Sequence, residues 1–183
     1  MNSLHMLRRR LIQLIVPVAL ALLIFAPTHA TAATSAVDFR NAVRKLWEDH
    51  VTWTRLYIVS VAADLPDKDL TAQRLLQNQT DIGNAIKPYY GDDAGNKLTA
   101  LLKDHILGAA DLLAAAKAGD KAKTDAASAK WYANGDDIAT FLSGANAKSW
   151  PLDAMKAGMK MHLDLTLQES VDRLGGKFAD DIK

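Results

Sequence analysis

The sequence predicts an all-α protein, an antiparallel up-and-down bundle of four to five helices that follows an N-terminal signal peptide. No segment alternates apolar and polar residues with a period of two over a useful length, so strands are not expected. Alanine and leucine dominate the composition, and both are strong helix formers. The breaks between helical segments are short, which favours antiparallel neighbours.

The chain begins with the features of a secretory signal peptide, which we place at residues 1–33. A basic stretch, Arg8–Arg10, precedes the apolar run Leu11–Pro27. Small residues follow, and cleavage is expected after Ala30 or Ala33. We therefore expect a periplasmic or secreted protein. An uncleaved leader that anchors the chain in a membrane is the alternative, although the apolar run is shorter than the roughly 20 residues of a spanning helix.

The remaining residues, 34–183, are expected to form one domain that is stabilised by its apolar core. The chain has no cysteine, so disulfides and a c-type haem attachment are excluded. A domain of this length buries roughly 70% of its unfolded surface, which is enough for a stable core. The leader holds three of the 22 basic residues and none of the 21 acidic ones, so the charges beyond it nearly balance. We expect no nucleic-acid partner, and contact with a membrane only through the leader.

The first two helical segments are bounded by breaks that contain proline. The first segment runs from about Asp38 to Ala63, where the sequence Asp-Leu-Pro-Asp ends it. The second runs from about Lys68 to Ile86, and Lys-Pro-Tyr-Tyr-Gly closes it. Proline disrupts a helix interior and glycine suits the turn that follows a helix, so both breaks predict helix ends.

Three further segments end at glycines. The third begins at Asp92 or Asp93 and continues to Lys117, and the fourth covers about residues 121–142. The fifth opens at Ser-Trp-Pro151 with a capping residue and an early proline, and Gly-Gly closes it. The last residues, KFADDIK, are typical of the opening turns of a sixth helix that stops before it could pack.

Three histidines remain beyond the leader, and each lies near the middle of a different predicted helix. His50, His105 and His162 fall twelve, twelve and eleven residues from the expected starts of the first, third and fifth helices. At a rise of 1.5 Å per residue, each imidazole lies roughly 17–18 Å from the start of its helix. If these three helices run parallel, the three imidazoles lie at nearly one height in the bundle.

Three imidazoles at one level of a bundle predict a metal or cofactor site, because bundles build such sites from inward side chains of facing helices. Neutral imidazole is a ligand for zinc, copper and iron, and burial keeps the ring neutral. The sequence therefore predicts metal ligands at His50, His105 and His162, with Glu169 as the carboxylate candidate on the same helix face as His162. Histidines that are hydrogen-bonded separately within the core are the alternative interpretation.

The second and fourth helices supply polar and aromatic residues at a similar height. Residues three apart share a helix face, so these side chains are candidates to contact a ligand or to orient an imidazole. Solvated helix faces are the alternative interpretation. The candidates are Arg74, Asn78, Asp81, Trp131, Asn134 and Asp137.

Every methionine beyond the leader lies close to His162. Met155 and Met159 share its helix face at helical spacing, whereas Met161 points elsewhere. Thioethers beside a histidine in an exported protein indicate copper(I), while a role as core filler is the ordinary alternative. A haem held by methionine and histidine is chemically allowed, but nothing in the sequence indicates a haem-sized pocket.

Four motifs stand out in the predicted helices: LWEDHVTWTRLY, RLLQNQTDIGNAIKPYYG, KWYANGDDIATFL and HLDLTLQESV. They resemble a family of uncharacterised bacterial secreted helical-bundle proteins over about Asp38 to Ile182. Members sometimes carry the labels acetylglutamate kinase or glycosyltransferase, and the residues here show neither architecture. Family members continue past Ile182 into a further helix, which implies that this chain lacks one. The resemblance implies a polar site that also includes Trp53, Thr54, Arg55, Asn84 and Thr166.

Enzyme signatures are absent from the sequence, which contains no G-x-S-x-G, Walker, G-x-G-x-x-G or H-E-x-x-H motif. The sequence favours an exported helical bundle that binds a transition metal (zinc, copper or iron) or a small polar ligand through its three histidines. Two alternatives stay open. One is a non-catalytic structural or interaction protein of the cell envelope, and the other is a small hydrolase or oxidase that uses the same residues.

Overall fold

The computed structural model describes residues 36–183, and all of the regular structure in this range is helical. The all-α prediction is therefore confirmed. The leader predicted at residues 1–33 and its cleavage sites lie outside the described range. Within that range, none of the helices combines the length and apolar character that crossing a bilayer requires. The helices are α2 (Ala36–Ala62), α3 (Lys68–Lys117), α4 (Lys121–Ala145), α5 (Leu152–Leu174) and α6 (Phe178–Ile182).

Helix α3 is a hairpin of two arms, residues 68–90 and 92–117, which meet at Gly91. Gly91 has φ +84°, a left-handed conformation that glycine adopts without a steric penalty. These arms are the second and third predicted helices. The first arm continues through Pro88 to the glycine, so the predicted end at Ile86 falls short.

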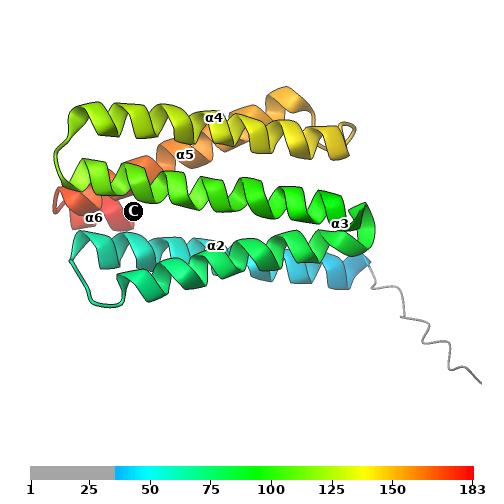
Figure 1. Ribbon diagram of the computed structural model, residues 1–183, viewed down its shortest axis with the longest axis horizontal. Helices are drawn as coiled ribbons and strands as arrows, with labels where there is room; N and C mark the ends of the chain where they lie inside the picture. The colour runs from blue at the N-terminus through cyan, green and yellow to red at the C-terminus, as the bar shows by residue number, and fades with distance from the viewer. Residues whose placement is uncertain (1–35) are drawn as a thin grey trace, which may run out of the picture. The chain divides into compact units, whose positions relative to one another are not determined.

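The helical rods alternate in direction along the long axis of the bundle (Figure 1). Helix α2, the second arm of α3 and α5 run one way, and the first arm of α3 and α4 run the other way. The antiparallel topology and the parallel run of the three histidine-bearing helices are therefore as predicted.

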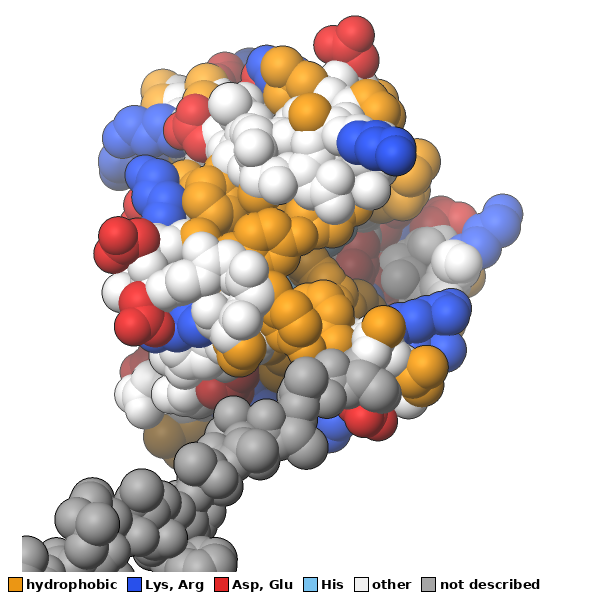
Figure 2. Space-filling model, turned by 90° about the vertical axis from the view of Figure 1, so that its right-hand side faces the viewer, with side chains coloured by type: hydrophobic (Ala, Val, Ile, Leu, Met, Phe, Trp, Pro, Cys, Tyr) orange, Lys and Arg blue, Asp and Glu red, His pale blue; other side chains and the backbone are white. Residues whose placement is uncertain are grey.

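The end of the bundle that carries the Gly91 turn is hollowed and rich in apolar side chains (Figure 2). A small cavity of about 30 Å³ lies beneath this surface, between both arms of α3, α4 and the segment before α5. Tyr90 and Trp150 lie at its outer side, and both are partly exposed. Leu98 and Leu142 lie at its inner side and also border the larger cavity described below.

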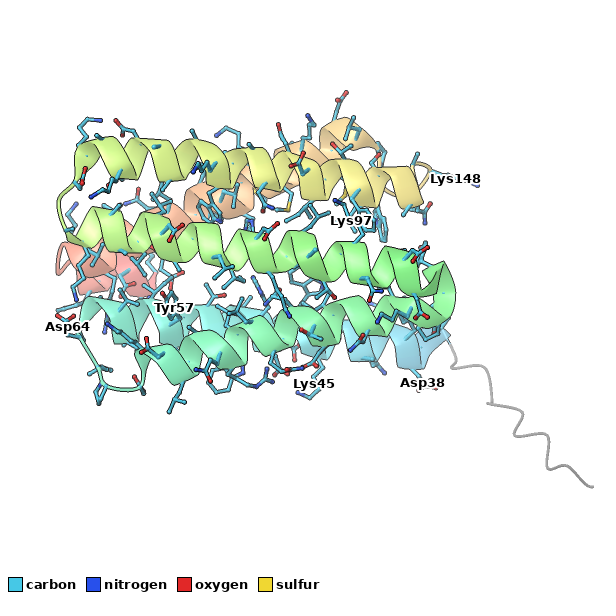
Figure 3. The ribbon with its side chains drawn as sticks, viewed as in Figure 1. Asp38, Lys45, Tyr57, Asp64, Lys97 and Lys148 are labelled. Carbon is cyan, nitrogen blue, oxygen red and sulfur yellow. The ribbon has the colours of Figure 1, made fainter. Side chains whose placement is uncertain are left out.

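Two clusters of buried apolar side chains form the core between α3, α4 and α5. Charged side chains such as Lys45 and Lys148 point away from the bundle, whereas Tyr57 lies between helices (Figure 3). The first cluster contains Ile82, Leu98, Leu101, Leu102 and Ile138, and the second contains Leu112, Trp131 and Leu163.

The two arms of α3 approach closely at a pair of glycines. A Cβ atom at Gly83 would lie 2.5 Å from the carbonyl oxygen of Gly95, and one at Gly95 would lie 2.6 Å from the carbonyl oxygen of Gly83. Both distances are too short for any side chain, so glycine at these two positions sets the separation of the arms.

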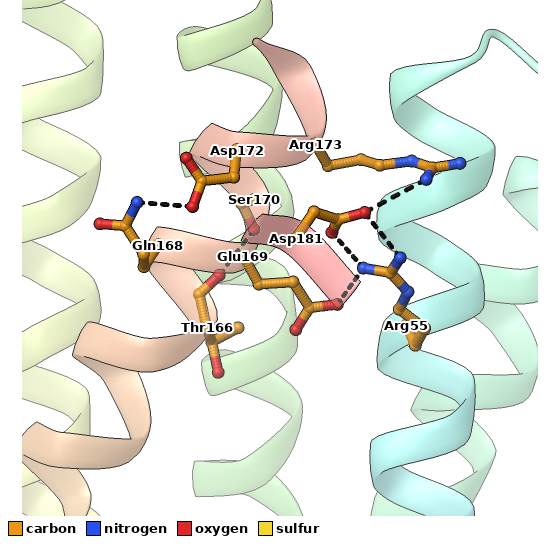
Figure 4. Close-up of polar contacts among 8 residues, drawn as sticks. All are labelled: Arg55, Thr166, Gln168, Glu169, Ser170, Asp172, Arg173 and Asp181. Atoms are coloured by element: carbon orange, nitrogen blue, oxygen red, sulfur yellow. Dashed lines mark hydrogen bonds and ion pairs between the residues drawn. The ribbon is translucent and has the colours of Figure 1, made fainter. Parts of the chain in front are cut away.

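Helix α6 packs against the bundle through a buried carboxylate. The side chain of Asp181 is fully buried and accepts hydrogen bonds from Arg55 of α2 and from Arg173 of α5, the latter at 3.2 Å (Figure 4). The expectation that residues 177–183 stop before they could pack is therefore wrong. A single helical turn suffices here because charge-assisted hydrogen bonds hold it in place.

Candidate functional site

The three predicted histidines converge between α2, the second arm of α3 and α5. The ring centroid of His162 lies 6.2 Å from that of His50 and 6.1 Å from that of His105. His50 and His105 are each 4% exposed, and His162 is half-buried. We call these three residues the histidine layer. Their shared level follows from their nearly equal distances from the starts of parallel helices.

The orientation of His105 is fixed by Asn134 of α4. The side-chain amide nitrogen of Asn134 donates to the carbonyl oxygen of Leu101 at 3.1 Å, which turns its oxygen toward the imidazole. Nδ1 of His105 lies 2.8 Å from that oxygen and must donate to it, because an amide oxygen only accepts. Nε2 of His105 therefore carries a lone pair. Trp131 stacks on the same ring at 5.3 Å.

The first arm of α3 places two fully buried amides, Asn78 and Gln79, near His50. The Gln79 amide nitrogen lies 3.3 Å from Nδ1 of His50 and donates to the carbonyl oxygen of Leu75 at 2.8 Å. It also donates to the Asn78 side chain, whose own nitrogen donates to the carbonyl oxygen of Leu46. An amide nitrogen has two N–H groups, and the oxygens of Leu75 and Asn78 take both, so the contact with Gln79 does not set which nitrogen of His50 carries the proton.

Burial keeps the histidine layer uncharged. Burial, together with the smaller effect of the neighbouring histidines, lowers the pKa of His50 and of His105 to about 4 each. Asn134 opposes the shift at His105 through its hydrogen bond. Burial lowers the pKa of His162 as well. Neutral rings with accessible lone pairs are the form that binds metals.

A cavity of about 160 Å³ adjoins the histidine layer. Its size is close to the roughly 150 Å³ of an engineered cavity that holds benzene. Among residues 36–183, the side chains that line it include no carboxylate, lysine or arginine. The lining consists of the three imidazoles with Met155, Met159, Trp47, Ile82, Leu98, Leu102, Ile138 and Leu142.

As the side chains stand, no three histidine, aspartate or glutamate groups within residues 36–183 are close enough to hold a metal ion together. Two imidazoles that share an ion through bonds of about 2.0–2.1 Å have ring centres roughly 5–5.5 Å apart. The observed centroid distances of 6.2 and 6.1 Å exceed this separation. Metal uptake would require the rings to close by ~1 Å.

Glu169, the predicted carboxylate ligand, lies away from the cavity. It accepts a hydrogen bond from Arg55 at 2.8 Å, and Asp181 binds the same guanidinium (Figure 4). We call Arg55, Glu169, Arg173 and Asp181 the arginine corner. Hydrogen bonding from Arg55 lowers the pKa of the Asp181 carboxyl. Glu169 is two helical turns from His162, and that separation brings it to the corner and not to the histidines.

Three predicted contact residues lie outside the cavity on more open positions. Asn84 and Asp137 are exposed, and Asp81 accepts a hydrogen bond from Gln77 at 2.9 Å. A step of three residues along a helix leaves the two side chains about 60° apart. That offset is enough to carry Asp137 to the surface while Asn134 faces inward.

Arg74 and Trp53, also predicted as contacts, join α2 to the first arm of α3. The guanidinium carbon of Arg74 lies 5.2 Å from the Trp53 ring, a cation–π contact, and an Arg74 nitrogen lies 3.7 Å from the Asp49 carboxylate. Neither residue lines the cavity at the histidines. Their arrangement supports the packing of the bundle.

Thr54, Trp131 and Thr166 line a second, smaller cavity of about 40 Å³. Thr54 and Thr166 each follow a histidine of the layer by one helical turn, so this cavity lies next to the first. The hydroxyl of Thr54 and the indole N–H of Trp131 are buried without a partner among the described residues. The three residues predicted as contacts therefore lie together, but beside the histidine cavity.

Gln79 is the functional residue that the sequence interpretation missed. Its side chain contacts Nδ1 of His50, and its side-chain oxygen is buried without a partner in the described range. The sequence does carry a signal for it, because Gln79 interrupts the apolar spacing of Leu75, Ile82 and Ile86 on one helix face. A lone polar residue on such a face is expensive to bury unless it is paired.

Comparison with known proteins adds no assignment to this geometry. No family model matches the chain, and neither the curated proteins nor the solved structures compared with it gave a match. The family resemblance of the four motifs stays a prediction, and the function has to follow from the residues of the site.

Proposed function

We propose that this protein, exported by its leader, binds a transition-metal ion through one nitrogen each of His50, His105 and His162. The observation that carries the proposal is the convergence of three imidazoles, two buried and one half-buried, from three parallel helices on one cavity. Three neutral nitrogen ligands leave a coordination position open toward the cavity. The proposed role is therefore metal binding and not a defined reaction.

The amides around the layer support this proposal. Metal-binding histidines commonly donate their second ring N–H to an oxygen, which fixes the ring and its tautomer. Asn134 already provides this for His105, because the Nδ1 proton is taken up by an amide oxygen. Nε2 of His105 is then ready to bind without any change of tautomer.

His50 is held less directly than His105. Its Nδ1 lies 3.3 Å from the Gln79 amide nitrogen, whose two N–H groups donate to the Leu75 carbonyl oxygen and to the Asn78 side chain. The proposal therefore needs only a neutral His50 ring, whichever nitrogen carries the proton.

The cavity favours a second candidate function, the binding of a small organic molecule with one polar group. Its volume of about 160 Å³ exceeds what an ion alone needs, and most of its lining is apolar. An imidazole could hold the polar group of such a molecule by a hydrogen bond. Phenol has a matching size and chemistry and serves as a probe.

Metal titration of the purified protein tests the first proposal. We expect one equivalent of cobalt(II) or zinc(II) to be retained, with cobalt(II) absorption bands typical of tetrahedral nitrogen ligands. His162→Ala should lose binding, and so should His105→Ala. Asp137→Asn, at an exposed position on the neighbouring helix, should bind as the wild type does. Far-UV circular dichroism checks that each variant is folded.

The outcomes separate the candidates. A wild-type protein that retains no metal overturns the metal proposal. If phenol then raises the melting temperature of the wild type but not of His105→Ala, the organic-ligand candidate stands. If the wild type retains no metal and phenol does not raise its melting temperature, the histidines are hydrogen-bonded core residues of a structural or interaction protein.

A further inference from the structure

The cavity at the histidine layer also contains thioethers. Met155 and Met159 line it together with all three imidazoles. Met159 precedes His162 by one helical turn, and its methyl group reaches α4, where it would lie 3.7 Å from a Cβ atom at Gly135. Met161 is 62% exposed and points away. The same helix therefore carries two methionines at the cavity and one outside it.

The donor atoms at the cavity are all nitrogen or sulfur. No oxygen ligand from a carboxylate is present among the lining residues within 36–183. Thioether and imidazole together suit a soft ion, and methionine in particular selects copper(I) among the ions available to proteins. Zinc(II) and iron sites in bundles, in contrast, commonly use carboxylates beside histidine.

The charge of the ion also favours copper(I). Neutral imidazoles and thioethers do not compensate the charge of a bound ion, and the surrounding side chains are apolar. The cost of burying an ion grows with the square of its charge, so a monovalent ion costs about a quarter as much as a divalent ion of equal size. A site without an anionic ligand in an apolar cavity therefore disfavours divalent ions relative to copper(I).

Building on the metal site proposed above, we propose that its ion is copper(I), held by the histidine layer and by the thioether of Met159. Met155, one turn further from His162, also lines the cavity and offers a replacement sulfur. The apolar lining on the remaining sides shields the ion from water. The protein would thus be a copper(I)-binding protein, with affinity set by sulfur as well as by nitrogen.

Competition with a copper(I) chelator such as bicinchoninate, under anaerobic and reducing conditions, tests this inference. We expect Met159→Leu to weaken copper(I) binding at least tenfold, and Met155→Leu to weaken it less. Met161→Leu is the matched control and should equal the wild type, because its side chain lies outside. X-ray absorption of the copper-loaded wild type should show a sulfur neighbour that Met159→Leu loses.

The same variants with cobalt(II) distinguish this inference from the metal site itself. Met159→Leu should retain cobalt(II) with unchanged affinity, because hard and borderline ions gain little from a thioether. The copper inference is overturned if the protein binds cobalt(II) but Met159→Leu binds copper(I) as tightly as the wild type does. The metal site itself would then still stand. If the wild type binds neither ion, both proposals fail.

Discussion

The histidine layer and the arginine corner are both polar clusters inside an apolar bundle, but they are satisfied in opposite ways. In the corner, Arg55 and Arg173 share the buried carboxylate of Asp181, and Glu169 adds a further hydrogen bond. In the layer, the neutral amide of Asn134 fixes His105, that of Gln79 lies beside His50, and all three rings line a cavity. Buried polar side chains alone therefore do not indicate a ligand site. Such a site also needs side-chain atoms that can bind a ligand and a cavity beside them.

The pH dependence of stability should separate the two clusters most strongly. Histidines in an unfolded chain titrate near 6.5, while burial holds the pKa of His50 and of His105 at about 4. The unfolded state therefore binds more protons between these values, and the free energy of unfolding falls as the pH falls through this window. The expected loss is up to about 3 kcal/mol for each ring.

Urea denaturation at pH 7, 5.5 and 4.5 measures this loss. His105→Gln should flatten the dependence, because one titrating group is removed. The lowered pKa of Asp181 contributes stability that is present above the unfolded value of 3.8 and lost only below it. An unchanged slope in His105→Gln would show that this ring is not buried in its neutral form.

Breaking the arginine corner should cost the next largest amount. Asp181→Ala leaves Arg55 with Glu169 alone and removes the contact that holds α6. Loss of one partner of a fully buried pair costs about 3–5 kcal/mol, and the partial exposure of Arg55 reduces this to about 2 kcal/mol. Chemical denaturation measures it, with Asp180→Ala, exposed on the same short helix, as control.

Metal binding should be insensitive to Asp181→Ala. If Asp181→Ala weakened cobalt(II) binding as strongly as it weakened stability, the two clusters would be one coupled network, and the contrast between them would be lost.

Removing the amide that orients His105 should weaken metal binding without abolishing it. Asn134→Leu frees the Nδ1 proton of His105 from its acceptor, and loss of such a partner typically lowers metal affinity about 10–100-fold. Chelator competition measures the change. The neighbouring Asp137→Asn again supplies the control, and equal affinity in both variants would mean that Asn134 only packs.

The smallest expected effect is a gain. Thr54→Val removes a buried hydroxyl that has no partner within the described residues and keeps the shape of the side chain. Replacing an unsatisfied polar group by an apolar one of equal shape should be neutral or stabilise the fold by up to about 1 kcal/mol. A loss of more than that in thermal unfolding would show that a bound water or ligand uses this hydroxyl.

Much of the fold follows from the sequence because helix ends carry local signals. Glycine and proline predicted the breaks close to their observed positions, and the nearly equal spacing of the histidines from the helix starts predicted their common level. The first arm of α3 extends beyond its predicted end at Ile86, because Pro88 is accommodated in a last turn that ends at Gly91. The glycine, and not the proline, therefore marks that boundary.

The site was harder to predict than the fold. Helical periodicity assigns a residue to a face, but it does not tell which neighbouring helix that face meets. Glu169 shares a face with His162, yet a distance of two turns brings it to Arg55. Gln79 escaped notice because a buried amide has no spacing motif, and its role depends on a histidine 29 positions away.

The glycine pair at the α3 hairpin has a consequence for the chemistry proposed near the middle of the second arm. His105 is ten residues beyond Gly95, or roughly 15 Å along the helix axis. A methyl group at either glycine would wedge the arms apart and tilt the rod that carries the imidazole. The alignment of the three rings thus depends on a distant contact, where the backbones of the two arms meet because neither glycine has a side chain.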